Sequence, residues 1–99
     1  MPTLHVPAAL RGLTGGRASV ATEARTVGEL LRAVEQLHPG LRGRLLEAGD
    51  LAPGLAVAVD GEIASEGLEA ALHPAAEVRL VPAIAGGGGR ARLAPRPAR

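Results

Sequence analysis

Polar and apolar residues alternate in two short segments near the start of the chain. Thr3–Val6 alternates in this way and stops at Pro7, and Ala18–Ala21 follows a Thr-Gly-Gly turn signal at 14–16. Alternation with a period of two is typical of a strand with one buried face, and glycine pairs are typical of turns. The two segments are therefore predicted to form a β-hairpin.

The pattern then changes to the period of a helix. Residues 26–29 have the Thr-x-x-Glu form of a capping box, in which the two side chains bind free backbone N–H groups of the first helical turn. The apolar residues that follow share one helical face: Val27, Leu30, Leu31, Val34 and Leu37. A helix is therefore predicted from Thr26 to Leu37, ended by Pro39-Gly40.

Shorter elements are predicted in the second half of the chain. Leu41, Leu45 and Leu46 indicate a short second helix before Gly49. Leucine and valine then alternate with alanine in the third predicted strand. The later elements are strand 55–59, an Asp60-Gly61 turn into a fourth strand around Ile63, a helical turn at Leu68–Leu72 and a last strand at Glu77–Pro82.

This order of elements predicts an α+β fold. One main helix connects the first hairpin to the remaining strands, so the economical arrangement is a mixed sheet packed on one face by that helix, with the first and last strands central and parallel. That arrangement is the ubiquitin-like β-grasp fold. The predicted domain covers residues 1–85, and residues 86–99, rich in Gly, Arg and Pro, are expected to form a flexible tail.

Composition narrows the classes of function. The 99 residues include no Phe, Tyr, Trp or Cys, so stacking on nucleic-acid bases, thiolate metal sites and thiol-based sulfur transfer are excluded. Residues 1–89 carry seven arginines against ten acids, a net charge of −3, whereas the last ten residues carry four arginines and no acid. Such a basic tail is more often a solvated end than a nucleic-acid arm, and a nucleic-acid partner is not favoured.

Conventional sites of catalysis and binding are missing from the sequence. The three histidines are far apart, the two serines have no neighbouring base, and no acidic cluster has metal-ligand spacing. The four-glycine run has no following Lys-Ser/Thr, which excludes a P-loop. We expect no enzyme activity, no bound cofactor and no metal. The chain also shows no signal peptide and no apolar run long enough to cross a membrane, so a cytoplasmic protein without a membrane partner is expected.

The unusual feature is the run of glycines after the last strand, Gly86 to Gly89. Glycine lacks Cβ, so a Gly-Gly end is thin enough to enter a narrow channel of another enzyme. A terminal glycine carboxylate is then a substrate that ATP activates as an acyl-adenylate and a sulfur donor converts to a thiocarboxylate. Glycine content alone favours the simpler interpretation, a linker before a disordered tail.

The run Val78 to Gly87, Val-Arg-Leu-Val-Pro-Ala-Ile-Ala-Gly-Gly, resembles the reactive end of the MoaD/ThiS family of sulfur carriers. The order of elements over residues 3–87 is similar too. The start of the chain, Val-Pro-Ala-Ala-Leu-Arg at 6–11, resembles the mycobacterial-type carrier that supplies sulfur for thiocarboxylate-dependent cysteine synthesis. The resemblance implies that Gly87 bears the thiocarboxylate and that Gly86 keeps the end of the chain slim.

Most family members stop at the Gly-Gly, whereas this sequence continues to Arg99. The resemblance therefore implies removal of the tail by a zinc-dependent JAMM-type protease, after Gly87 or alternatively after Gly89. The implied partners are an E1-like adenylating and sulfur-transferring enzyme, which uses ATP, and a pyridoxal-phosphate-dependent cysteine synthase. Alternative acceptors are the molybdopterin synthase large subunit and enzymes of thiamine or other sulfur metabolites. A ubiquitin-like interaction domain or protein modifier is the alternative from another class.

A carrier must also dock on its partners. The helix covers one face of the predicted sheet, so the other face is expected to present apolar residues, with Val81 and Ile84 as candidate contacts closest to the tail. An ordinary solvated sheet face would show the same pattern.

Overall fold

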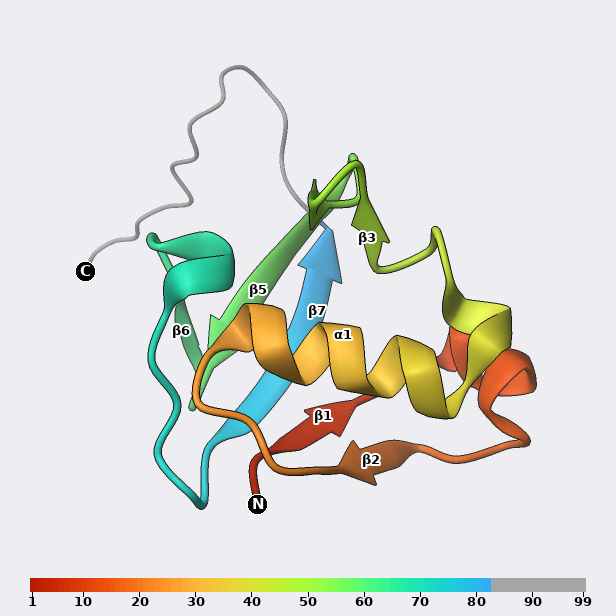
Figure 1. Cartoon of the computed structure of the whole chain (residues 1–99), viewed down its shortest axis with the longest axis horizontal. Helices are drawn as coiled ribbons and strands as arrows, with labels where there is room; N and C mark the ends of the chain where they lie inside the picture. Colours follow the sequence, from red (N-terminus) through yellow and green to blue (C-terminus); the bar gives the residue numbers. More distant parts are fainter. Residues whose placement is uncertain (83–99) are drawn as a thin grey trace.

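A computed structural model of the chain describes residues 1–82, which form a five-stranded sheet with one long helix across it (Figure 1). The sheet strands are β1 (Thr3–His5), β2 (Ser19–Ala21), β5 (Leu55–Val59), β6 (Glu62–Ile63) and β7 (Glu77–Pro82), and the helix is α1 (Val27–Leu37). Two short strands, β3 (Leu46–Glu47) and β4 (Asp50–Leu51), pair separately. Three 3-10 helices complete the fold: η1 (Ala8–Thr14), η2 (Pro39–Leu41) and η3 (Gly67–Glu69).

The strand order of the main sheet is β2-β1-β7-β5-β6. The first and last strands, β1 and β7, are neighbours and run parallel, while the other pairs in this sheet are antiparallel. A parallel pair needs a long crossover connection, and the segment containing α1 supplies it on one face of the sheet. This is the predicted β-grasp arrangement, with the two chain-terminal strands at its centre.

The capping box of α1 forms with a shift of one residue. The Thr26 hydroxyl accepts a hydrogen bond from the Glu29 N–H at 3.2 Å, as predicted. The Glu29 carboxylate, however, accepts from the N–H of Arg25, at 2.8 Å, rather than from that of Thr26. The helix therefore starts at the predicted position, and its first turn also fixes the chain that enters it.

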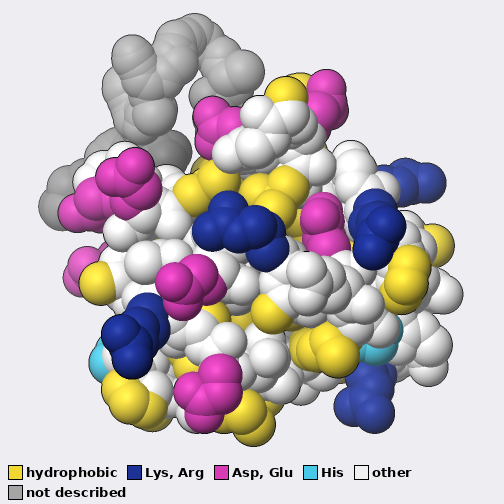
Figure 2. All heavy atoms as spheres, in the orientation of Figure 1, with side chains coloured by type: hydrophobic (Ala, Val, Ile, Leu, Met, Phe, Trp, Pro, Cys, Tyr) yellow, Lys and Arg dark blue, Asp and Glu magenta, His cyan; other side chains and the backbone are white. Residues whose placement is uncertain are grey.

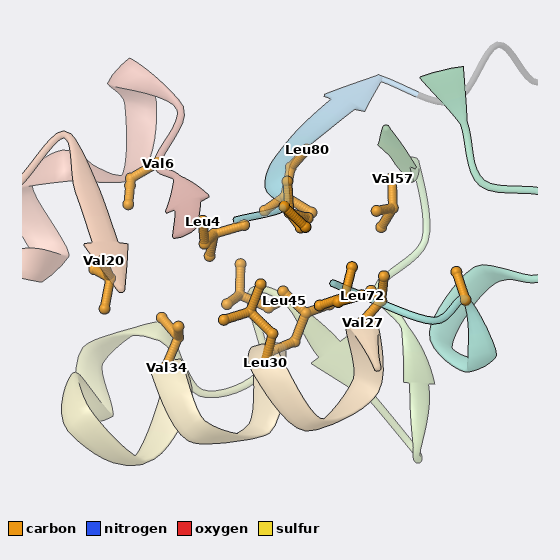
Figure 3. Packing of buried hydrophobic residues seen from close by; sticks show 14 of the residues in the cluster. Leu4, Val6, Val20, Val27, Leu30, Val34, Leu45, Val57, Leu72 and Leu80 are labelled. Atoms are coloured by element: carbon orange, nitrogen blue, oxygen red, sulfur yellow. The ribbon is translucent and has the colours of Figure 1, made fainter. Parts of the chain in front are cut away.

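The core lies between α1 and the sheet (Figure 3). Val27, Leu30, Leu31 and Val34 are fully buried on the helix side, and they face Leu4, Val57, Val78 and Leu80 of the sheet. Leu37 was expected on the same face but is 57% exposed. Ten residues of helix rotate it about 80° away from Val27, so it lies at the margin of the apolar face.

The predicted second helix is wrong in extent and type. Residues 39–41 form a single 3-10 turn, and residues 46–51 form the β3-β4 hairpin. Ala48 and Gly49 have φ angles of 56° and 83°, which end any helix and close this hairpin. Glu35 of α1 holds the extended segment, because its carboxylate accepts a hydrogen bond from the Leu46 N–H at 3.0 Å.

The 3-10 helix η1 was not predicted. Its two leucines, Leu10 and Leu13, are one 3-10 turn apart and pack partly buried against the core, but a single such spacing is too short to predict a helix. Thr14 at its end is 3% exposed, and its hydroxyl lies 3.0 Å and 2.9 Å from the carbonyl oxygens of Arg11 and Arg17. Within residues 1–82, no helix is both long and apolar enough to cross a membrane.

Candidate functional site

The last strand determines where the segment with the predicted reactive glycines begins. β7 ends at Pro82, which pairs with Leu55 at the start of β5 (Figure 1). Gly86, Gly87, Gly89 and Ile84 lie outside the described residues, as does the predicted domain boundary at residue 85. A chain spans at most ~3.6 Å per residue, so Gly87 lies within about 18 Å of Pro82. Any enzyme that acts on Gly87 must therefore work close to this end of the sheet.

Val81, the other candidate for partner contact, lies on the sheet face that α1 does not cover. Its neighbours along β7, Val78 and Leu80, are buried in the core, and alternation places Val81 on the opposite side. Val81 is half-buried and pairs with the half-buried Ala56 of β5. Its placement agrees with the sequence-based expectation, while contact with a partner stays a prediction.

We call the sheet face away from α1 the open face. Besides Val81, it carries Ala58, only 8% exposed, and its partner Ile63, 45% exposed. Polar side chains share this face on the central strands. His5 of β1 and Glu77 of β7 form a hydrogen-bonded pair, with 2.9 Å between Nε2 and Oε1. The open face is therefore mixed, apolar towards β5 and β6 and polar towards β1.

A shallow pocket of about 280 Å³ lies on the open face beside the end of β7. Its lining includes His5, Arg11, Ser19, Arg79 and Val81. These residues come from β1, η1, β2 and β7, so the pocket exists because the parallel pairing of β1 and β7 brings their carboxyl ends together. By contrast, basic and acidic side chains are interspersed over the face that carries α1 (Figure 2).

The two arginines of the pocket were not singled out by sequence reasoning. Arg79 lies between Val78 and Leu80 in the alternating pattern of β7, and this is sufficient to place it on the open face. No local pattern places Arg11 at the pocket, because only the fold brings η1 beside β7. Its Nε donates a hydrogen bond to the Val6 carbonyl at 3.0 Å, which fixes the guanidinium near the end of β1.

A second polar cluster lies at the other end of β7. Asp60 accepts hydrogen bonds from the Glu77 N–H at 2.9 Å and from the His73 ring, with 2.7 Å between Nε2 and Oδ2. The Glu77 N–H, followed by the His73 side chain, lowers the pKa of Asp60 below its ordinary value of 3.8. The cluster ties the β5-β6 turn to the start of β7 and lies far along the strand from Pro82.

The described residues bring together no set of groups for metal chemistry. Within residues 1–82, no group of three or more His, Cys, Asp or Glu side chains could hold a metal ion. What the described residues provide is a domain whose last strand ends at Pro82 beside a mixed open face and a basic pocket.

Comparison with known proteins gives a consistent result. The family model described as the ThiS family matches residues 4–87, so the match ends at the second glycine of the run. Sulfur carrier protein CysO of Mycobacterium tuberculosis is 32% identical over 90 residues, which cover 86% of this chain and 97% of that protein. Small archaeal modifier protein 3 of Haloferax volcanii is 38% identical over 64 residues, 63% of this chain and 70% of that protein.

Solved structures agree with the sequence comparison. In the crystal structure of the Amycolatopsis orientalis BexX/CysO complex, the matching chain is 36% identical, with a TM-score of 0.77, and the match covers 88% of this chain and 100% of that one. The similar proteins are small carriers and modifiers. This confirms the predicted fold and the prediction that the chain is not itself an enzyme.

Proposed function

The chain belongs to the ThiS family, and on that basis we propose that its Gly86-Gly87 end is adenylated and converted to a thiocarboxylate that donates sulfur. The observation that carries the proposal is the family match, which runs from the first strand to Gly87 and stops there. It favours Gly87 over Gly89 as the reactive residue. The β-grasp domain then serves to hold and present this end.

The proposed chemistry takes place in a partner enzyme. The Gly87 carboxylate attacks the α-phosphate of ATP, pyrophosphate leaves, and a sulfur donor then displaces AMP from the acyl-adenylate to leave a C-terminal thiocarboxylate. ATP belongs to the E1-like adenylating enzyme, and the carrier contributes the carboxylate. Glycine suits positions 86 and 87 because a Cβ would widen the chain where it enters the narrow active-site channel of the partner enzyme.

Residues follow Gly87 in this sequence, so its carboxyl group is part of a peptide bond. We propose that a JAMM-type zinc protease hydrolyses the bond between Gly87 and Gly88 before activation. Cleavage after Gly89 is the alternative. The uncleaved chain would then be a precursor.

The proposed acceptor pathway is cysteine synthesis, through a pyridoxal-phosphate-dependent cysteine synthase. Support comes from the CysO sulfur carriers, since the match to this chain covers 97% of their length. A molybdopterin synthase large subunit is the alternative acceptor. A chain of similar fold has been solved in the BexX/CysO complex, and this supports the proposal that the present chain docks on a protein partner.

A protein-modifier function is the second candidate, favoured by the 38% identity to a small archaeal modifier protein. The same Gly87 carboxylate, once activated, would then be joined to an amine of a target protein. The two functions share activation and differ in the nucleophile that attacks the activated glycine.

The test uses three forms of the chain, namely residues 1–99, residues 1–87, and residues 1–87 with Gly87→Ala. Each is mixed with the adenylating enzyme of the same genome, ATP and sulfide, and its mass is measured. We expect the mass change of one oxygen replaced by sulfur in the 1–87 form alone, with poor reaction of Gly87→Ala. Equal reaction of the 1–99 form contradicts the proposal. Amide-linked adducts of the 1–87 form with other proteins, without thiocarboxylate, indicate the modifier function instead.

A further inference from the structure

The pocket beside the end of β7 contains positive charge without a matching negative one. Arg11 and Arg79 both line it, and none of its lining residues is acidic. In the part of the chain that the structure describes, the carboxylates within ion-pairing distance of a basic side chain are Glu77, beside His5, and Asp60, beside His73, so neither arginine is paired with a carboxylate there. The sequence contains no Asp or Glu after Glu77.

Both arginines are positioned by secondary structure that packs on the core. Arg79 lies between two buried residues of the central strand β7, with exposures of 0% for Val78 and 8% for Leu80. Arg11 uses Nε to bind the Val6 carbonyl, which leaves its terminal N–H groups for another acceptor. A guanidinium presents several N–H donors in a planar fork that matches a carboxylate, and two such groups at one pocket favour an anion.

The pocket is also placed where a partner must lie. Val81 lines the pocket and is also the strand residue immediately before Pro82, where β7 ends. Gly87 lies at most about 18 Å along the chain from Pro82. An enzyme that takes Gly87 into its active site therefore comes close to the pocket beside the end of β7. Residues 1–87 have a net charge of −3, so the pocket is a local basic spot on an acidic protein.

We propose that this pocket docks an Asp or Glu side chain of the adenylating enzyme, with Arg11 and Arg79 as the recognising groups. The inference rests on the proposed function, since it assumes that an enzyme acts on Gly87. Contact between the two proteins removes water from the shallow pocket, which strengthens the charge-assisted hydrogen bonds. An acidic chain thereby gains one attractive contact that fixes its orientation as the glycine end enters the enzyme.

The experiment uses the 1–87 chain and its Arg11→Gln, Arg79→Gln and doubly substituted variants. Arg25→Gln is the matched control, because Arg25 is an exposed arginine in the loop before α1 and outside the pocket. Measurements are the dissociation constant for the adenylating enzyme without ATP, and KM and kcat of thiocarboxylate formation. We expect the double variant to raise the dissociation constant and KM roughly tenfold, with kcat within about twofold. Arg25→Gln should behave as the unsubstituted chain.

Arg11→Lys and Arg79→Lys keep the charge and should recover part of the lost affinity, and melting temperatures show that each variant is folded. High salt should narrow the difference between the double variant and the unsubstituted chain. An unchanged dissociation constant in the folded double variant overturns the inference. A rise in KM for ATP instead of KM for the carrier also overturns it, because the anion would then be a nucleotide phosphate.

The two proposals fail in different ways. If the unsubstituted chain binds the enzyme and the arginine variants bind more weakly, but no thiocarboxylate forms, docking stands and the proposed function fails. If thiocarboxylate forms equally in all variants with unchanged binding, the function stands and the docking inference fails. Absence of both binding and reaction contradicts both.

Discussion

Asp60 joins three segments of the fold through one side chain. It has a φ angle of 52°, in the left-handed region that Asp and Asn tolerate better than most residues. Its carboxylate accepts from the Glu77 N–H and from the ring of His73. Nδ1 of that ring lies 3.3 Å from the backbone nitrogen of Ala75, which can donate to it, and this geometry fits the tautomer in which Nε2 carries the proton and donates it to Asp60.

The lowered pKa of Asp60 leads to a prediction about acid stability. A carboxyl group whose pKa is lower in the folded than in the unfolded chain stabilises the fold above its unfolded pKa of 3.8, and this contribution is lost as pH falls through the folded pKa. Asp60→Asn keeps an oxygen acceptor for Glu77 and tolerates the left-handed backbone, but removes the charge. The melting temperature of the variant should therefore be lower near pH 7 and converge with that of the parent as the pH falls below 3.8 and through the lowered pKa of the folded state.

Glu62→Gln is the control for this measurement. Glu62 is an exposed carboxylate of β6, two residues further along the chain. The melting temperature of the Glu62→Gln variant should follow that of the parent chain at every pH. A constant gap between Asp60→Asn and the parent at all pH values would show that the Asp60 charge contributes nothing. The chain has no Phe, Tyr or Trp, so unfolding is followed by far-UV circular dichroism or calorimetry.

At the scale of elements, strong periodic patterns and the Asp60-Gly61 turn signal predicted the structure, whereas the prediction for the segment 39–51 was wrong. The helix over 27–37 and the strands over 3–5, 19–21, 55–59 and 77–82 follow patterns of four or more residues. The segment 39–51 does not, because its leucines share helical spacing while Gly43 and Gly49 adopt left-handed backbone, with φ angles of 80° and 83°. Its conformation depends on Glu35, which binds the Leu46 N–H from a neighbouring helix. Contacts of that kind cannot be inferred from local spacing.

The exposure of Leu37 allows a matched test of the helix face. Leu31 is fully buried and Leu37 is 57% exposed on the same helix. Leu31→Ala should lower the free energy of unfolding by about 2–5 kcal/mol, because it removes buried methyl groups and leaves a cavity. Leu37→Ala should change it by less than ~0.5 kcal/mol. Chemical denaturation measures both.

Equal effects of the two substitutions would contradict the packing of α1 against the sheet. A loss confined to Leu37→Ala would mean that the exposed end of the helix, rather than its buried face, stabilises the domain.

At the scale of the whole molecule, the sequence predicts one part of the candidate site, the glycine segment. The other part, the basic pocket, is found only once the fold is known. The glycine proposed to react, Gly87, follows from a motif that is contiguous in the chain, and the family match ends at the same residue. The basic pocket follows from no motif. Arg11 and Arg79 meet because β1 and β7, the two ends of the domain, pair in parallel at the centre of the sheet. Such long-range pairing carries no local signal.

The same central pairing predicts how the domain responds to loss of residues 88–99. Within residues 1–82, which the structure describes, every member of the core cluster lies from Leu4 to Leu80, so the 1–87 chain retains all of that cluster. Its melting temperature should match that of the 1–99 chain within about 2 °C, since 1 kcal/mol shifts the melting temperature of a domain this size by ~4–8 °C.

The net charge of the 1–87 chain should be −3 instead of +1, and it should bind an anion-exchange resin at pH 7 that the 1–99 chain passes through. A chain ending at Val78 is the control, and should not fold because it lacks Leu80 and the β5 pairing of β7. A fall of several degrees in the 1–87 chain would mean that the removed residues stabilise the domain, and processing after Gly87 would then weaken the carrier that it is proposed to activate.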